Sequence, residues 1–148
     1  LVTSASTDWY PEISPSGRWL VYHSNESGRN EIYVRSYPDV DAGLWQLSPS
    51  GGRYAIWSRG EDEIFYRNGD QMMAVPIFTA GVFEFGTPSV LSRGKYATRG
   101  SRHYDVAADG RRFLMIKEHI SEEMLDHTEI HIVLNWFEEL KRIVPTND

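Results

Sequence analysis

One ten-residue phrase recurs three times along the chain. It reads ISPSGRWLVY from Ile13 to Tyr22, and degraded copies run from Trp57 to Tyr66 (WSRGEDEIFY) and from Val106 to Met115 (VAADGRRFLM). Successive copies are offset by 44 and 49 residues. Each copy is a polar turn followed by an apolar strand, and such a unit repeated every roughly 40–50 residues is typical of the blades of a β-propeller. The repeat therefore predicts an all-β chain.

Each repeat divides into short strands separated by Gly, Pro, Asn, Asp and Ser, which favour turns. In the first repeat we expect strands at Trp9–Ser14, Trp19–Ser24, Glu31–Ser36 and Leu44–Ser48. In the second we expect Tyr54–Ser58, Glu63–Arg67, Gln71–Ile77 and Pro88–Leu91. In the third we expect Arg102–Ala107, Arg112–Lys117 and Glu129–Leu134. These strands predict three antiparallel blades, at about 8–48, 52–91 and 101–134, within a single domain that spans residues 1–148.

The C-terminal segment has a different pattern. Asn135 followed three residues later by Glu138 is a capping box, and apolar side chains then recur at helical spacing until Pro145. We expect a short amphipathic helix over 136–143, with a stripe of Trp136, Phe137, Leu140 and Ile143. Such a stripe packs on its own sheet more often than on a partner, although docking on a partner stays open.

Charge and composition narrow the possible functions. The net charge of −6 argues against nucleic-acid binding, because the phosphate backbone requires a basic face. No apolar run approaches the roughly 18 residues of a membrane span, and the chain contains no cysteine for thiolate chemistry. We expect a soluble protein that needs no cofactor. The sequence does not distinguish a cytoplasmic from a periplasmic location, and since position 1 is Leu, a removed export signal stays open.

The repeat also resembles a known family. The run DWYPEISPSGRWLVYHSNESGRNEIYVRSYPD is similar to the repeat of TolB-like (WD-like) β-propellers, and in particular to the propellers fused behind bacterial serine/threonine kinases. Further motifs follow in the same order: Trp57–Arg67, Met72–Ile77, Tyr104–Met115 and Leu134–Arg142. The resemblance implies the accessory propeller and not the kinase, because no kinase motif is present. Family propellers usually have six or more blades, so three blades imply half of a ring.

Two turns depart from the family pattern. Ser16 stands where the first turn usually has Asp, and Gly60-Glu61 stands where the second is expected to have Asp-Gly. The third turn, Asp109-Gly110, keeps the pattern.

Aligning the repeats brings one set of side chains to equivalent positions. The residues just ahead of, or opening, the first strand of each repeat are Trp9-Tyr10, Arg53-Tyr54 and Arg102-His103. In a propeller such loops converge on one end of the central channel. Arginine and aromatic residues commonly anchor ligands and partners, so we expect a protein or a small anionic ligand at this channel mouth. The alternative is that the aromatic rings cap the packing of the blades while the arginine side chains lie over them.

A metal site is a weaker candidate. His127, Glu129 and His131 occupy alternate positions, which point to one face of a strand and could bind zinc. No fourth ligand follows at a suitable spacing, so an exposed polar strand face is the simpler interpretation. Because the chain also has no Gly-x-Ser-x-Gly elbow and no phosphate loop, we expect no enzymatic activity.

The strand count predicts self-association. The third repeat lacks a fourth strand, whereas Leu1–Ser4 is an orphan strand ahead of the first repeat. Two chains related by a two-fold axis could exchange this strand and close a six-bladed ring of four-stranded blades, which would hide the open edges. The expected function is therefore a non-enzymatic binding or protein-interaction module that forms a homodimer. The alternatives are a structural fragment of a larger kinase-fused or receptor-like propeller, and a metal-dependent hydrolase.

Overall fold

The computed structural model describes residues 6–97 and 100–117 together with the backbone of 130–132. This part of the chain is all-β, contains no helix and is built from antiparallel sheets, as the sequence predicts. It belongs to two compact units, residues 1–94 and 95–148. The expected helix over 136–143 and the expected strand Leu1–Ser4 lie outside the described residues, so both stay predictions.

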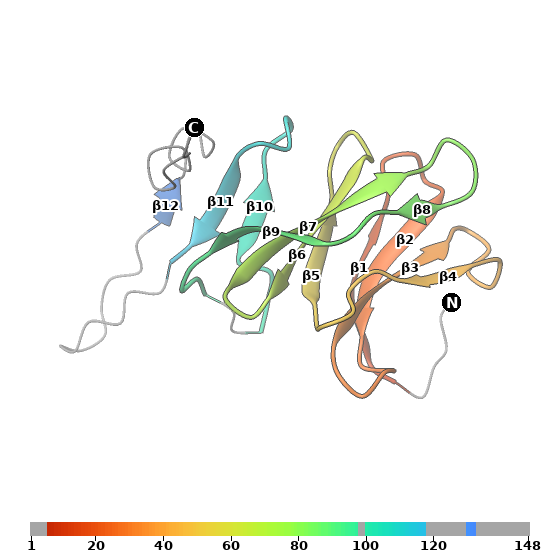
Figure 1. Ribbon diagram of the computed structural model, residues 1–148, viewed down its shortest axis with the longest axis horizontal. Helices are drawn as coiled ribbons and strands as arrows, with labels where there is room; N and C mark the ends of the chain where they lie inside the picture. The colour runs from red at the N-terminus through yellow and green to blue at the C-terminus, as the bar shows by residue number, and fades with distance from the viewer. Residues whose placement is uncertain (1–5, 98–99, 118–129, 133–148) are drawn as a thin grey trace, which may run out of the picture. The chain divides into compact units, whose positions relative to one another are not determined.

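The first unit contains two sheets (Figure 1). The first sheet has the order β1-β2-β3-β4, with β1 at Asp8–Ile13, β2 at Trp19–Ser24, β3 at Glu31–Ser36 and β4 at Leu44–Gln46. The second sheet has the order β5-β6-β7-β8, with β5 at Arg53–Trp57, β6 at Glu63–Asn68, β7 at Gln71–Phe78 and β8 at Glu84–Phe85. A fifth strand, β9 at Ser89–Arg93, also pairs with β7.

The second unit contains the third sheet. Its order is β10-β11-β12, with β10 at Tyr104–Val106, β11 at Phe113–Ile116 and β12 at Ile130–Ile132. All of its pairings are antiparallel. Three antiparallel sheets therefore follow one another along the chain, and the first strand of each ends at the residue where a copy of the repeat begins.

The core of the first unit lies between its two sheets. One face of the first sheet and one face of the second contribute apolar side chains that are almost completely buried, among them Val21, Ile32, Val34, Trp57, Ile64, Tyr66 and Val75. The first strands of the two sheets are also joined directly, because the Trp57 backbone N–H donates to Glu12 Oε1 at 3.3 Å and the Trp57 indole N–H donates to the Glu12 carbonyl at 3.4 Å. The alternating strand pattern thus places one apolar face of each sheet against the other.

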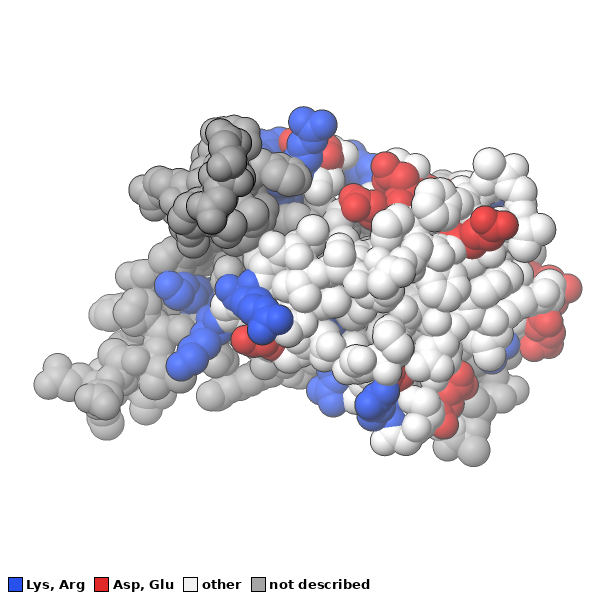
Figure 2. All heavy atoms as spheres, viewed as in Figure 1, with Lys and Arg blue, Asp and Glu red and all other residues white. Residues whose placement is uncertain are grey.

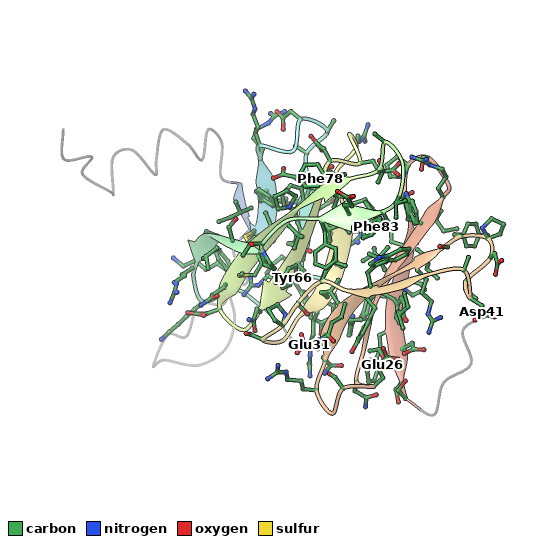
Figure 3. All side chains as sticks on the ribbon, turned by 45° about the vertical axis from the view of Figure 1, so that its right-hand side comes forward. Glu26, Glu31, Asp41, Tyr66, Phe78 and Phe83 are labelled. Carbon is green, nitrogen blue, oxygen red and sulfur yellow. The ribbon has the colours of Figure 1, made fainter. Side chains whose placement is uncertain are left out.

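The loop between β7 and β8 extends this core. Its Phe83 is 2% exposed and contacts Trp19 and Trp45 of the first sheet, with ring centroids 5.0 and 4.8 Å apart. Figure 3 shows Phe83 beside this loop, near the more exposed Phe78. Burying a side chain of this size contributes about 1.5–3 kcal/mol. The loop therefore stabilises the packing of the second sheet on the first.

The two unusual turns of the sequence meet each other. Glu61, in the turn between β5 and β6, accepts hydrogen bonds from Ser16 in the turn between β1 and β2. The Ser16 backbone N–H lies 2.7 Å from Glu61 Oε2, and the Ser16 hydroxyl lies 2.7 Å from Oε1. Glu61 is only 8% exposed and adopts a left-handed φ of 58°. Gly17 and Gly110 hold the equivalent positions with φ of 73° and 68°, so Glu61 occupies a backbone conformation that favours glycine.

Candidate functional site

The first strands of the first two sheets share a backbone irregularity. The register of β1 with β2 shifts between Trp9 and Glu12, and that of β5 with β6 shifts between Arg53 and Ile56. Within these bulges Tyr10 has a φ of 54° and Tyr54 a φ of 60°, both left-handed. Tyrosine rarely adopts this conformation, because its Cβ crowds the backbone. The first two repeats thus share a strained backbone as well as a residue type. Bulges of this kind change the direction of the side chains they carry.

The re-aimed rings meet around a histidine from β2. His23 stacks with Trp9 at a centroid distance of 5.5 Å and with Tyr10 at 5.6 Å. Tyr54 approaches edge-on, 5.4 Å from His23 and 5.0 Å from Tyr10. We call these four residues, Trp9, Tyr10, His23 and Tyr54, the aromatic cluster. His23 and Tyr54 are buried, whereas Trp9 is 36% exposed, so the cluster has a buried base and a solvent-facing ring.

The environment of His23 fixes its protonation state. The pKa of His23 is lowered to about 4. Burial is the main cause, the positive charge of Arg53 acts in the same direction, and the negative charge of Asp8 partly opposes them. His23 Nδ1 accepts a long hydrogen bond from the Tyr54 backbone N–H at 3.4 Å. The ring is therefore neutral near pH 7, with its proton on Nε2.

Arg53 supplies a positive charge beside the aromatic cluster. It opens β5, and its side chain is exposed. The Asn30 side-chain oxygen, once the amide is turned to face the guanidinium, accepts from Arg53 Nε at 3.0 Å and from Nη2 at 2.6 Å. Asn30 is neutral, and among the described residues no carboxylate forms an ion pair with Arg53. The guanidinium is thus oriented without being neutralised.

Arg29, unlike Arg53, has a carboxylate partner among the described residues. Arg29 forms an ion pair with the buried Glu31, Nε to Oε1, at 2.5 Å, and Arg29 Nη2 also donates to the Pro49 carbonyl. Glu31 in turn accepts from the Ser48 hydroxyl and from the Gly51 backbone N–H. The pKa of Tyr66 is raised to about 12, first by the burial of its hydroxyl and second by the negative charge of Glu31. Figure 3 shows Tyr66 and Glu31 near each other. This network ties the segment after β4 to the first sheet, and its charges are already satisfied.

The structure brings four of the six expected site residues together. Trp9, Tyr10 and Tyr54 form the aromatic cluster with His23, and Arg53 adjoins it. Arg102 and His103 belong to the second compact unit, where His103 Nε2 lies 2.8 Å from the Ser101 hydroxyl and the His103 carbonyl accepts from the Ile116 N–H. The convergence of all six residues on one opening stays a prediction.

The weaker metal candidate lies outside the described part of the chain. His127 and Glu129 are not described, and only the backbone of His131 is, in β12. Within the described residues, no three His, Cys, Asp or Glu side chains group so as to hold a metal ion. The same residues include no helix that could cross a membrane.

Comparison of the chain with protein-family models and with curated protein sequences found no match.

Proposed function

We propose that the chain is a non-enzymatic binding module of the TolB-like β-propeller type, in which each sheet is one blade. It holds a protein segment or a small ligand at the aromatic cluster. The observation that carries this proposal is the pair of left-handed tyrosines, Tyr10 and Tyr54, at equivalent positions of two repeats. Such a backbone costs of order 1–3 kcal/mol per residue. This strained backbone recurs at the equivalent place in two sheets, and four rings meet there. Its recurrence favours a role in binding.

The side chains indicate the ligand. Trp9 offers an exposed ring face, and Arg53 offers a guanidinium with no ionic partner among the described residues. Arginine pairs well with carboxylate or phosphate, and an aromatic ring packs against apolar or planar groups. We therefore expect an acidic ligand that carries an aromatic or apolar group next to its negative charge. His23 serves as a neutral support for the rings, since its pKa lies well below 7.

A pair of synthetic peptides tests this. One is an N-acetylated heptapeptide with Phe flanked by two Glu, and its match has Gln in place of both Glu. In heteronuclear NMR titrations the Glu peptide should shift the Trp9 indole resonance, while the Gln peptide should bind roughly tenfold more weakly, because a charged hydrogen bond is lost.

Two variants complete the test. Arg53→Gln should weaken binding of the Glu peptide roughly tenfold and remove its preference over the Gln peptide, because the charged partner is gone. Arg111→Gln, an exposed arginine in the second unit, is the matched control and should leave both affinities unchanged. Equal binding of both peptides to the natural chain, or shifts confined to residues distant from Trp9, would refute the proposal.

A further inference from the structure

A second surface of the first unit lies away from the residues of the aromatic cluster. A groove of about 630 Å³ runs between the segment that follows β4 and the segment that joins β8 to β9. Its lining consists of Gln46, Leu47, Pro49, Phe85, Gly86, Thr87 and Pro88. None of these side chains is charged. Figure 2 shows a largely uncharged face over this part of the molecule, with acidic and basic residues toward its edges.

The backbone of β4 is open at this groove. Among the described strands, β4 pairs only with β3. The Leu47 N–H donates to the Ile32 carbonyl at 2.8 Å, so Leu47 turns its backbone groups toward β3. Successive residues of an antiparallel strand alternate in this respect. Gln46, paired in register with Tyr33, therefore turns its N–H and C=O away from β3, at the position where Gln46 lines the groove.

The walls favour apolar side chains. Phe85 is 37% exposed although it is a large aromatic residue, and Pro49 and Pro88 also line the groove. Leu47, 1% exposed, is fixed in the core of the first unit and gives the groove a rigid base. An open strand edge beside an apolar wall has the two features of β-strand addition, in which backbone hydrogen bonds give affinity and alternate side chains give specificity.

We propose that this groove binds an extended, uncharged segment of a partner protein, which adds to the open edge of β4 as a further strand. The occupant must be a strand because the unsatisfied groups are the N–H and C=O of a strand edge. It must be uncharged because a charged side chain would lose its hydration against Phe85, Pro49 and Pro88 without finding an opposite charge. This site is independent of the aromatic cluster, and the Glu and Gln peptides are not its ligands.

The probe is a library of random ten-residue peptides displayed on phage. The enriched peptides are synthesised with a fluorescent label, and their affinity is measured by anisotropy. The expected consensus has no Lys, Arg, Asp or Glu across its central residues. Hydrogen exchange of the complex should show slowed exchange of the Gln46 amide, which strand addition requires.

Three variants isolate the contributions. Gln46→Pro removes the outward N–H and should weaken peptide binding roughly three- to tenfold, the value of one net hydrogen bond. Gln46→Ala keeps that N–H and is its matched control, with less than about a twofold effect. Thr87→Arg places a charge on an exposed position of the groove and should abolish binding without a change in melting temperature.

The outcomes are distinct. Peptides that are highly charged, that leave the Gln46 amide unprotected, or that bind Thr87→Arg as well as the natural chain would overturn the inference. Failure to enrich any peptide would also overturn it. If Gln46→Pro proves unfolded by circular dichroism, the Thr87→Arg result and the exchange of the Gln46 amide decide the question alone.

Discussion

His23 is the residue on which the aromatic cluster depends. It is 4% exposed, stacks with two rings and accepts from the Tyr54 N–H. The hydrogen bond from Tyr54 requires that Nδ1 carry no proton. A proton on Nδ1 would face a donor, and the added charge would be buried next to the positive charge of Arg53. The site is therefore built around a histidine that stays unprotonated over most of the physiological range.

We predict that acid destabilises the first unit through His23. Its folded pKa, about 4, lies below the ordinary value of 6.5, so between these values the unfolded chain binds more protons than the folded chain. The free energy of unfolding should fall as the pH drops from about 6.5 to about 4, and the contribution of His23 should level off below that. The maximum loss is on the order of 3 kcal/mol.

Urea unfolding at several pH values measures this effect. His23→Gln keeps an acceptor for the Tyr54 N–H but does not titrate, so it should lose most of the dependence between pH 6.5 and 4. An unchanged slope in this variant would show that other groups cause the acid sensitivity.

At this scale the sequence predicted part of the site. Repeat alignment singled out Trp9, Tyr10, Arg53 and Tyr54, because equivalent positions in repeats adopt equivalent places. It did not identify His23 or Asn30. Both lie outside the aligned loop positions. His23 reaches the cluster through its register with Trp9, and Asn30 contacts Arg53 through hydrogen bonds. The one available signal was an isolated His in the apolar strand WLVYHS.

At the scale of elements, the turn between β1 and β2 and the turn between β5 and β6 are matched to each other. Ser16 donates both its N–H and its hydroxyl to the Glu61 carboxylate. Each residue differs from its equivalent in the third turn, where Asp109 and Gly110 stand, and the two differences fit together. An Asp at position 16 would place a second carboxylate against Glu61, whereas a Gly at position 61 would relieve its left-handed φ but leave Ser16 without this acceptor.

We predict that the two positions are energetically coupled. Ser16→Asp should reduce the free energy of unfolding by about 2 kcal/mol, because a hydrogen bond to a charged group is replaced by repulsion. In the Glu61→Gly background the same Ser16→Asp change should cost close to nothing. A double-mutant cycle from urea unfolding measures the coupling, and a value within about 0.3 kcal/mol of zero would show that the turns act independently.

The strands were largely predictable because their period and turn residues are local signals. Glu31–Ser36 and Trp19–Ser24 have the expected bounds, and the other described strands differ from expectation by one or two residues at their ends. Of the expected strand Glu129–Leu134, only Ile130–Ile132 is described. The two-residue strand β8 was not expected, because Glu84–Phe85 is too short to show a pattern and forms by pairing with the end of β7. The bulges in β1 and β5 were missed for a related reason, since they depend on pairing between strands.

At the scale of the whole molecule, the first sheet carries two exposed apolar side chains on the face opposite its core face. Ile13 pairs with Leu20, Leu20 with Arg35 and Arg35 with Leu44, so these four side chains form one row across the strands. Ile13 and Leu44 are each 46% exposed. The opposite face of the same sheet is covered by the second sheet through the core. Apolar side chains on a sheet face are usually buried against another layer.

We predict that this face associates with a second copy of the chain, consistent with two chains that together complete a six-bladed ring. Light scattering after size exclusion should give twice the mass of one chain at micromolar concentration.

Ile13→Lys should weaken the association roughly tenfold or more, because a charge would be buried in an apolar contact. Val82→Lys, at a loop residue that is 75% exposed and outside the row, is the matched control and should leave the mass unchanged. The mass of a single chain at all concentrations would refute the prediction. Dissociation of both variants would show that the contact lies elsewhere.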